Sequence, residues 1–370
     1  MKSTRLWALA CLLVMGGLSM ASARAEDADH TKGAVFVMTN AAVDNQIAAY
    51  SRQEDGSLVA EGTYSTGGNG SGGTVDPLHS QGSLRLSHDH RLLFAVNAGS
   101  GTVSSFAVWG STLTRLDTQS TGGSSPTAVA QSGDLLYVLN SGGNGNVSGF
   151  RIAWDGRLQP IKDSTRNLSD ATTSPTSLAF SPDGQFLVVT ETATNKIDVF
   201  RVYDDGKLSA ITVNASSDAT PFAPVFAPNG ALIVGSASNF VSSYWILPNR
   251  TLSVISASLP TLGKATCWDV VTAHGRFVYT SNAGTSSISG FKIGWKGVLT
   301  ALDSTVVGSN PAGATNLDIA ASDNGKFLYT LNTAAGAIGI FMVDHDGNLV
   351  DLGPVTGLPA SAGMNGIAAY

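Results

Sequence analysis

Charged residues are scarce in this chain of 370 residues. Only 13% of the residues are charged, with 21 Lys and Arg against 27 Asp and Glu, about half the usual share for a soluble domain. The basic residues form no cluster, which argues against a nucleic-acid-binding surface. Beyond the first 25 residues no apolar run approaches the length of a membrane span.

Glycine, in contrast, is abundant. Its 42 residues keep no three-residue period, which excludes collagen. Hydrophobic residues make up 43% of the chain and the net charge is only −6, which excludes a disordered chain. The composition indicates a β protein rich in small residues.

The first 25 residues have the pattern of a secretory signal peptide. Lys2 and Arg5 precede an apolar stretch over residues 6–20, and Ala23-Arg24-Ala25 supplies a cleavage site of the A-x-A type. We therefore expect an exported protein, periplasmic or secreted, with residues 26–33 as a short lead. Cleavage leaves 18 basic and 27 acidic side chains, a net charge of −9, and Cys267 as the last cysteine. No internal disulfide is then possible.

The rest of the chain is built from a repeat. Residues 174–208 contain four short runs of alternating apolar residues, separated by turn sequences such as Ser181-Pro-Asp-Gly184. We name the four strands of such a unit A to D. An aromatic residue recurs in strand C at Tyr50, Phe106, Phe150, Phe200, Tyr244, Phe291 and Phe341.

The spacing of these aromatics averages about 48 residues, and seven such units predict an all-β, seven-bladed propeller of four-stranded antiparallel blades. Residues 34–39 read as a B strand without an A strand before it, and residues 363–370 as an A strand without a B strand after it. We expect the C-terminal strand to join blade 1 and close the ring, making residues 34–370 a single domain. We expect a monomer.

The end of each B strand and the start of each A strand meet at one rim of a propeller. The predicted B ends are mostly asparagines, at Asn40, Asn97, Asn140, Glu191, Gly235, Asn282 and Asn332. Asparagine in this place is expected to support the B–C turn. Glu191 is a poor turn residue and is the first candidate for a functional acid.

At the start of strand A, one predicted position is occupied by Ser83, Ala128, Ser177, Ala223, Asp269, Asp318 and Gly366. Two adjacent carboxylates at a channel mouth would raise one pKa into the range of general acid–base catalysis, or would share a cation. Alternatively, each Asp accepts a backbone N–H bond.

Neighbouring residues are candidates for substrate binding. Trp268 offers a stacking platform, although a Trp here is also typical of the core between blades. Gln81 and Asn316 lie two residues before the predicted rim position, and His79 belongs to a Gly-rich insert that could overhang the mouth. The other histidines fall in turns away from this rim. No zinc-ligand spacing or nucleophile elbow is present, and Cys267 has no His partner in sequence.

Two segments, SPTSLAFSPDGQFLVVTETATNKIDVF (174–200) and HGRFVYTSNAGTSSISGFKI (274–293), resemble the seven-bladed lactonase family of 6-phosphogluconolactonase-type and carboxymuconate-cyclising propellers. The resemblance covers residues 33–370 and is closest to an exported branch. It implies a pocket residue at Glu191, without the Asn that precedes it in the family. The family's His in a G-P-H stretch is missing from residues 124–127 and 173–176, and Arg85 is the only Arg in an A strand.

The missing basic residues and the charge of −9 disfavour a phosphorylated substrate. We therefore predict an exported lactonase-like enzyme that hydrolyses, or forms, a small non-phosphorylated lactone at the channel mouth. Glu191, Asp269 and Asp318 are its predicted catalytic residues; Gln81, Trp268, Asn316 and His79 are its predicted substrate-binding residues.

No cofactor is expected, with a divalent cation at the mouth as an open alternative. The expected partner is a small molecule, without nucleic acid or a membrane span. The alternative hypothesis is a non-catalytic propeller that binds a ligand, a glycan or a surface partner through its loops. It predicts exposed aromatics at the C–D turns, among them Trp109, Trp154 and Trp295.

Overall fold

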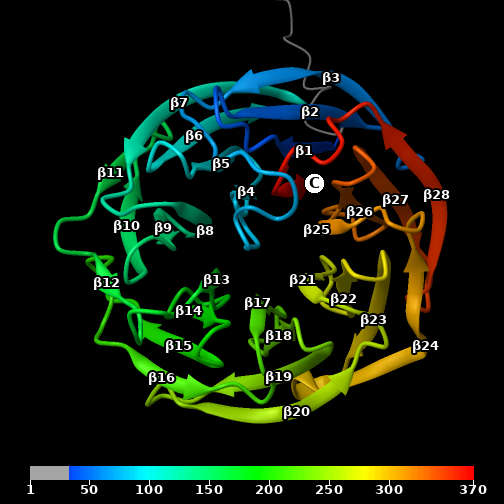
Figure 1. Cartoon of the computed structure of the whole chain (residues 1–370). Coiled ribbons are helices and arrows are strands. Elements are labelled where there is room, and N and C mark those ends of the chain that lie inside the picture. Colours follow the sequence, from blue (N-terminus) through cyan, green and yellow to red (C-terminus); the bar gives the residue numbers. More distant parts are fainter. Residues whose placement is uncertain (1–32) are drawn as a thin grey trace, which may run out of the picture.

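The computed structural model describes residues 33–370, which form a ring of seven antiparallel sheets around a central axis (Figure 1). The predicted signal peptide and most of the predicted lead lie outside the described residues. Each sheet is one blade, with strand A nearest the axis and strand D at the circumference. The predicted seven-bladed propeller is confirmed. Within the described residues, no helix has the length and apolar character needed to cross a membrane.

Blades 1 to 4 follow the A–B–C–D order, and blade 3 has its outer strand split in two. Blade 1 comprises β29 (Ile367–Ala369), β1 (Ala34–Met38), β2 (Gln46–Arg52) and β3 (Leu58–Ser65). Blade 2 comprises β4 (Leu84–Leu86), β5 (Leu92–Asn97), β6 (Thr102–Trp109) and β7 (Thr112–Ser120). Blade 3 comprises β8 (Pro126–Ser132), β9 (Leu135–Asn140), β10 (Asn146–Ile152), β11 (Leu158–Pro160) and β12 (Arg166–Asn167). Blade 4 comprises β13 (Pro175–Phe180), β14 (Phe186–Glu191), β15 (Lys196–Arg201) and β16 (Thr212–Ala215).

Blades 5 to 7 repeat the same order, and a short 3₁₀ helix forms the C–D turn of blade 6. Blade 5 comprises β17 (Pro221–Phe226), β18 (Leu232–Ser236), β19 (Phe240–Ile246) and β20 (Leu252–Pro260). Blade 6 comprises β21 (Thr266–Val271), β22 (Phe277–Asn282), β23 (Ser287–Ile293), η1 (Trp295–Gly297) and β24 (Leu299–Ser309). Blade 7 comprises β25 (Asn316–Ala321), β26 (Phe327–Asn332), β27 (Ala337–Val343) and β28 (Leu349–Thr356).

The repeated aromatics of strand C hold the blades together. All seven are buried, and each faces an apolar residue of strand B in the same register, as Phe106 faces Leu93 and Phe200 faces Leu187. Because blades diverge from the axis, large side chains are needed to fill the wedge between them. The aromatics are therefore structural.

The C-terminal strand closes the ring as predicted. Strand β29 pairs with β1, with Ile367 opposite Val37 and Ala369 opposite Val35. Arg52 Nε donates to the Tyr370 carbonyl at 2.9 Å, and the Tyr370 hydroxyl donates to the Gly110 carbonyl at 3.0 Å. The last residues thus complete the sheet of blade 1 and tie it to blade 2, which closes the ring.

The strand pairing corrects the predicted alignment at three places. Ser236 rather than Gly235 lies opposite the start of strand A, at Pro221, and Thr39 rather than Asn40 lies opposite the start of strand C, at Gln46. In blade 6, Trp268 lies opposite Ser281, the register position that Ser177 and Ala223 take in blades 4 and 5, so Asp269 lies one residue further along the strand. The same bulge opens strand A in these three blades, so it does not cause the shift.

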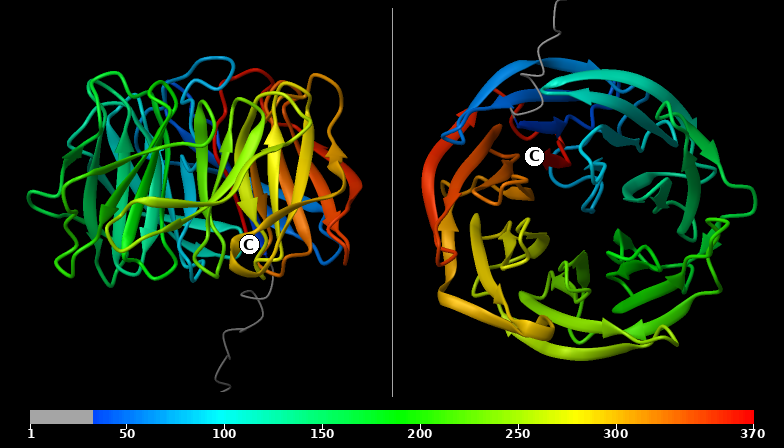
Figure 2. Two further views of the ribbon diagram at one scale, coloured as in Figure 1. Left: turned by 90° about the horizontal axis from the view of Figure 1, so that it is seen from below. Right: turned by 180° about the vertical axis from the view of Figure 1, so that it is seen from behind.

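The two faces of the ring carry different loops (Figure 2). Antiparallel order puts the A–B and C–D turns on one face, which we call the turn face, and the B–C and D–A connections on the other, the rim face. On the turn face, Trp154 is 99% exposed and Trp295 83% exposed, while Trp109 is half-exposed. The aromatics predicted to be exposed at the C–D turns are exposed.

Candidate active site

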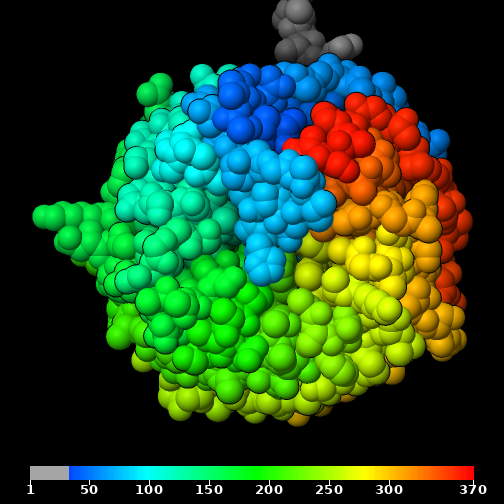
Figure 3. Space-filling model, in the orientation of Figure 1, coloured from blue at the N-terminus to red at the C-terminus, as the bar shows by residue number. Residues whose placement is uncertain are grey.

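The insert before strand β4 closes the rim face of the central channel. We call residues 67–82 the plug; in Figure 3 it reaches over the middle of the ring. The Gln81 side chain makes two hydrogen bonds across the ring to the backbone of Asp269, donating from Nε2 to the carbonyl at 2.7 Å and accepting the N–H at 3.1 Å. Trp268 Nε1 donates to the Ser80 carbonyl at 2.9 Å. The mouth expected on this face is therefore covered.

Below the plug lies a cavity of about 690 Å³ that reaches toward the turn face. Strand A of every blade contributes to its wall, and Gln81 and Gly82 form its floor. At the other end its lining includes exposed residues of the A–B turns, among them His88, Pro182 and Pro228. The channel is thus accessible from the face opposite to the predicted one. The A–B turn that contains His88 and His90 borders its opening.

Asp318 is held at the floor by backbone donors from two blades. Its Oδ1 accepts the Ile319 N–H at 2.8 Å, and its Oδ2 accepts the Ile367 N–H of the closing strand at 3.1 Å. Its φ is +146°, a conformation that favours glycine, and strain of this kind is concentrated at functional sites. Burial raises the pKa of this carboxyl to about 7, although the backbone N–H bonds and Arg85 act in the opposite direction.

Arg85 is the only Lys or Arg among the residues that line the cavity. Its Nε is buried without a hydrogen-bond partner in the described chain. Burial lowers the pKa of the guanidinium, while the charge of Asp318 raises it. Gly82 leaves room for this group, because a Cβ at Gly82 would lie 3.2 Å from Arg85 Nη2. A guanidinium with a free Nε–H beside a carboxyl of raised pKa can bind a developing oxyanion.

Asp269 contributes to the lining but is only 1% exposed, and its side chain lies against blade 5. Both of its carboxylate oxygens would be 2.5 Å from a Cβ at Gly235. The other blades carry apolar residues at this register position, such as Leu178 and Ile319. Neither oxygen has a side-chain or backbone partner of good geometry within residues 33–370. Burial raises the pKa of Asp269 to about 8.

Glu191 lies outside the cavity, fully buried within blade 4. Its Oε1 accepts the Ser169 N–H at 3.0 Å, and its Oε2 accepts the hydroxyls of Ser169 and Thr194. Asp198 packs beside it, and burial together with Glu191 raises the pKa of Asp198 to about 9. Neither Asp198 oxygen has another hydrogen-bond partner within residues 33–370, so below that pH a protonated Asp198 can donate to the ionised Glu191. The pair holds the loop before β13 in place.

Three further candidates lie around the plug rather than in the cavity. Trp268 is 1% exposed and packs edge-on against Phe222 at 5.2 Å, so its ring offers no open face. His79 is exposed on the outer side of the plug and contacts Phe222. Asn316 is fully buried and donates to the Ser287 carbonyl at 3.0 Å. Of the seven predicted site residues, the structure brings Gln81, Asp269 and Asp318 together at the floor.

Sequence reasoning gave no role to Arg85 and placed His88 and His90 away from the site. Arg85 could have been identified from the sequence, because it is a basic residue in an A strand at a position where the other blades have Ala or Val. Residues 33–370 contain no group of three or more His, Cys, Asp or Glu side chains that could hold a metal ion. Cys267 is buried and free, and burial raises the pKa of its thiol.

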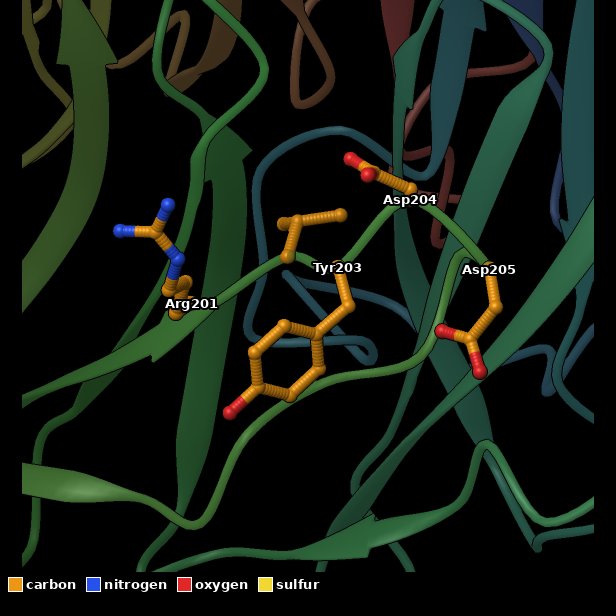
Figure 4. A pocket seen from close by; sticks show the side chains of 5 residues that line it. Arg201, Tyr203, Asp204 and Asp205 are labelled. Carbon is orange, nitrogen blue, oxygen red and sulfur yellow. The ribbon is translucent and has the colours of Figure 1, made fainter.

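A second depression of about 450 Å³ lies beside the C–D turn of blade 4. Figure 4 shows the side chains of Arg201, Tyr203, Asp204 and Asp205 pointing in different directions there. They converge on no common point, so this depression is a weaker candidate for chemistry than the central cavity.

The ring and its axial cavity define a propeller of the lactonase type. The chain belongs to the family described as "Lactonase, 7-bladed beta-propeller", whose model matches residues 27–167 and 73–356. Over 238 residues, 60% of this chain and 68% of the relative, it is 26% identical to a 6-phosphogluconolactonase of Serratia proteamaculans (strain 568).

Solved structures share the fold at lower identity. The periplasmic gluconolactonase PpgL of Pseudomonas aeruginosa superimposes with a TM-score of 0.68 at 20% identity, over 90% of this chain and 99% of that one. A protein of Lactobacillus plantarum superimposes with a TM-score of 0.70 at 19% identity, over 92% and 98% of the two chains.

Proposed function

We propose that this protein hydrolyses a small, non-phosphorylated lactone in the central cavity. The observation that carries the proposal is the cavity floor, where the strained carboxyl of Asp318 interacts electrostatically with the Arg85 guanidinium, whose buried Nε has no hydrogen-bond partner in residues 33–370. A general base works best when its pKa is close to the working pH, and the pKa of Asp318 is raised to about 7. Membership of the lactonase family supports this choice of reaction.

In this mechanism Asp318 takes a proton from a water molecule whose oxygen attacks the lactone carbonyl carbon. The tetrahedral oxyanion that forms is stabilised by the Arg85 guanidinium. The bond between the carbonyl carbon and the ring oxygen then breaks, and the proton moves from Asp318 to the leaving ring oxygen. One water is consumed, and the product is a hydroxy acid that releases its carboxyl proton to solvent, so that the resulting carboxylate pairs with Arg85.

The charge of the cavity supports a substrate without phosphate. Arg85 is the only Lys or Arg in the lining, and Asp269 and Asp318 line the same cavity. Phosphoryl groups are commonly bound by clusters of Arg, Lys or backbone N–H groups. The Serratia relative is named a 6-phosphogluconolactonase; we propose that the present chain shares the lactone chemistry but takes an uncharged ring.

The test is Asp318→Asn in purified protein lacking residues 1–25, assayed by acid release from a panel of uncharged lactones. Loss of the general base is expected to lower kcat by about 10²–10⁴-fold. Asp351→Asn, an exposed residue on the outer strand β28 of the same blade, is the matched control and should keep full activity. Hydrolysis by Asp318→Asn at the control's rate would refute the proposal.

A second candidate function is glycan binding through the turn face, which the exposure of Trp154 and Trp295 favours. Tryptophan rings stack on sugar rings when one face is open to solvent. The double variant Trp154→Ser, Trp295→Ser should then lose co-sedimentation with insoluble cell-wall polysaccharide. Val254→Ser, which alters another exposed apolar residue, is the control. Equal sedimentation of both variants would refute this function.

We also propose that the protein is exported. The support is the basic start, apolar stretch and A-x-A site of residues 1–25. Cell fractionation followed by N-terminal sequencing should find a mature chain that begins at Glu26 outside the cytoplasm. A cytoplasmic chain that retains Met1 would contradict export.

A further inference from the structure

The Gln81 side chain occupies the inner edge of blade 6. Strand β21 is the edge strand of its sheet, so its backbone N–H and C=O groups that face the channel have no strand partner. The Gln81 amide fills this place at Asp269: Nε2 donates to the carbonyl at 2.7 Å, and Oε1 accepts the N–H at 3.1 Å. A flipped amide would set donor against donor and acceptor against acceptor, so these two bonds fix which end of the amide carries the hydrogens.

The backbone of Gln81 is held by a different blade. Its N–H donates to the Thr176 carbonyl at 3.2 Å, and the Ser177 hydroxyl donates to its carbonyl at 2.8 Å. The residue is buried. Blade 4 therefore anchors the backbone and blade 6 orients the side chain, so the amide turns only if bonds to both blades break.

The Gln81 amide also reaches the proposed general base. An amide nitrogen carries two hydrogens, and the Asp269 carbonyl takes one of them. Asp318 Oδ1 lies 3.5 Å from the same nitrogen, as the acceptor for the other hydrogen. This bond is long for an N–H donor, and the charge of an ionised carboxylate strengthens it. Gln81 thus links the plug to blade 7 across the floor of the cavity.

The donors around Asp318 are unevenly divided between its two oxygens. Each oxygen of an ionised carboxylate has two acceptor sites. Oδ1 accepts the Ile319 N–H and faces the Gln81 amide, so both of its sites are used. Oδ2 accepts the Ile367 N–H alone among the described residues. The acceptor site that remains for a water hydrogen is therefore on Oδ2.

Resting on the proposed function, we propose that Gln81 is a positioning residue for Asp318, whose amide N–H occupies Oδ1 and so makes Oδ2 the atom that takes the proton from water. Gln81 exchanges no proton itself. Oδ2 receives the proton when the water oxygen bonds to the carbonyl carbon, and gives it to the ring oxygen when the ring opens. The same contact connects the reaction to the plug, because blades 4 and 6 hold the amide in place.

The contact is tested first in the wild-type protein, through the two Gln81 amide protons in nuclear magnetic resonance spectra. Their signals are assigned by their absence in Gln81→Met. The proton directed at Asp318 should change its chemical shift as the pH passes through the titration of that carboxyl, and should lose this change in Asp318→Asn. Gln81 protons that do not titrate in the wild type, or that titrate equally in Asp318→Asn, would overturn the inference.

The variant Gln81→Met keeps the length of the side chain and removes the amide. Since a hydrogen bond to the ionised form lowers the pKa of a carboxyl, the midpoint of the Asp318 titration should rise by about half to one pH unit. Infrared difference spectra of the carboxyl band, assigned by its absence in Asp318→Asn, give this midpoint without any substrate. An unchanged midpoint would contradict the role of Gln81.

The variant Ser80→Ala is the matched control within the plug. It removes the bond from the Ser80 hydroxyl to the Thr127 carbonyl at 2.9 Å, and should lower the Tm without moving the Asp318 midpoint. An equal rise of the midpoint in Ser80→Ala would assign the effect to loosening of the plug rather than to the Gln81 amide, and would refute the inference.

Rates separate the inference from the proposed function. Gln81→Met should lower kcat by about ten-fold, because the carboxyl is no longer held in one orientation, and should move the acid limb of kcat/KM to higher pH. Ser80→Ala should do neither. Absence of turnover with every lactone would refute the proposed function, while the two titrations would still decide whether Gln81 acts on Asp318. A lower kcat in Gln81→Met with the acid limb at the wild-type pH would refute the inference.

Discussion

Arg85 is a single cation in a layer of alanine and valine, and its charge acts on Asp318. The guanidinium lowers the pKa of that carboxyl, and burial raises it. Arg85 is also the group that would face the oxyanion in the proposed reaction. The two effects can be separated experimentally, because one changes the pH at which the base ionises and the other changes the rate once it is ionised.

Arg85→Gln is therefore expected to alter the pH profile as well as the rate. Without the cation the pKa of Asp318 rises above its value of about 7, so the acid limb of the profile of kcat/KM against pH moves to higher pH. The plateau should fall by about 10²–10³-fold, as for the loss of an oxyanion donor.

The matched control for Arg85→Gln is Arg115→Gln, an exposed arginine of β7 whose Nη1 donates to the Ser65 carbonyl. Its profile should coincide with that of the wild type. If Arg85→Gln lowered the rate with the acid limb at the wild-type pH, Asp318 would not be the ionising base.

At the scale of strands, blade 4 departs from a hydrogen-bond relay that other blades share. In blade 3, Asn140 donates to Ser148, and Ser148 donates to the Thr121 carbonyl of the preceding loop. Blades 2 and 6 repeat this with Asn97 and Ser104, and with Asn282 and Ser289. Blade 4 has Glu191 and Asp198 in the same two register positions. A protonated Asp198 can donate to Glu191, in the opposite direction to the bond from Asn to Ser, but only while it keeps its proton.

The double variant Glu191→Asn, Asp198→Ser is expected to restore the common relay in blade 4. It should fold, and its Tm should fall less than that of the wild type between pH 7 and pH 10, since the wild-type pair loses its shared proton near pH 9. Differential scanning calorimetry across this range is the measurement. Glu191→Asn alone leaves Asp198 without its acceptor and should be less stable than the double variant at every pH.

The same variant tests the catalytic role predicted for Glu191. Under the proposed mechanism the double variant hydrolyses lactones at the wild-type rate, because the pair lies outside the cavity lining. A folded double variant with no activity would show that the catalytic site lies at the rim of blade 4, as the sequence predicted.

At the scale of the whole molecule, sequence spacing was enough to predict the ring but not the side on which it opens. Aromatics such as Phe150 and Phe200 recur at the blade period because every wedge needs one. The position of the plug depends instead on contacts across the ring, as between Gln81 and Asp269, which are 188 residues apart. The predicted alignment also placed Asp269 one register position off, because Trp268 takes the position of Ser177 and Ala223, and Asp269 is a residue buried against blade 5.

Four carboxyls of raised pKa, three of them buried and Asp76 half-buried, share one direction of pH dependence. Burial raises the pKa of Asp76 and Asp318 to about 7, of Asp269 to about 8 and of Asp198 to about 9. In the unfolded chain an aspartate ionises near pH 3.9. Between that pH and the folded pKa the folded protein holds protons that the unfolded chain has released. The contribution of these four carboxyls to stability is therefore full below about pH 3.9, declines as the pH rises, and is lost once the pH has passed 7 to 9.

The substitution Asp269→Asn tests this pH dependence at one of the four carboxyls, whose oxygens have no hydrogen-bond partner of good geometry within residues 33–370. The amide keeps the shape of the carboxyl against Gly235 but does not titrate. The wild-type free energy of unfolding, from urea titrations between pH 5 and pH 9, should decline with increasing pH, and one group contributes at most about 1.4 kcal/mol per pH unit. The variant should decline less steeply up to pH 8, while Asp303→Asn, on the exposed outer strand of the same blade, should follow the wild type. Parallel curves for wild type and Asp269→Asn would mean that this carboxyl is ionised in the folded protein, and that an unseen cation or water compensates its charge between blades 5 and 6.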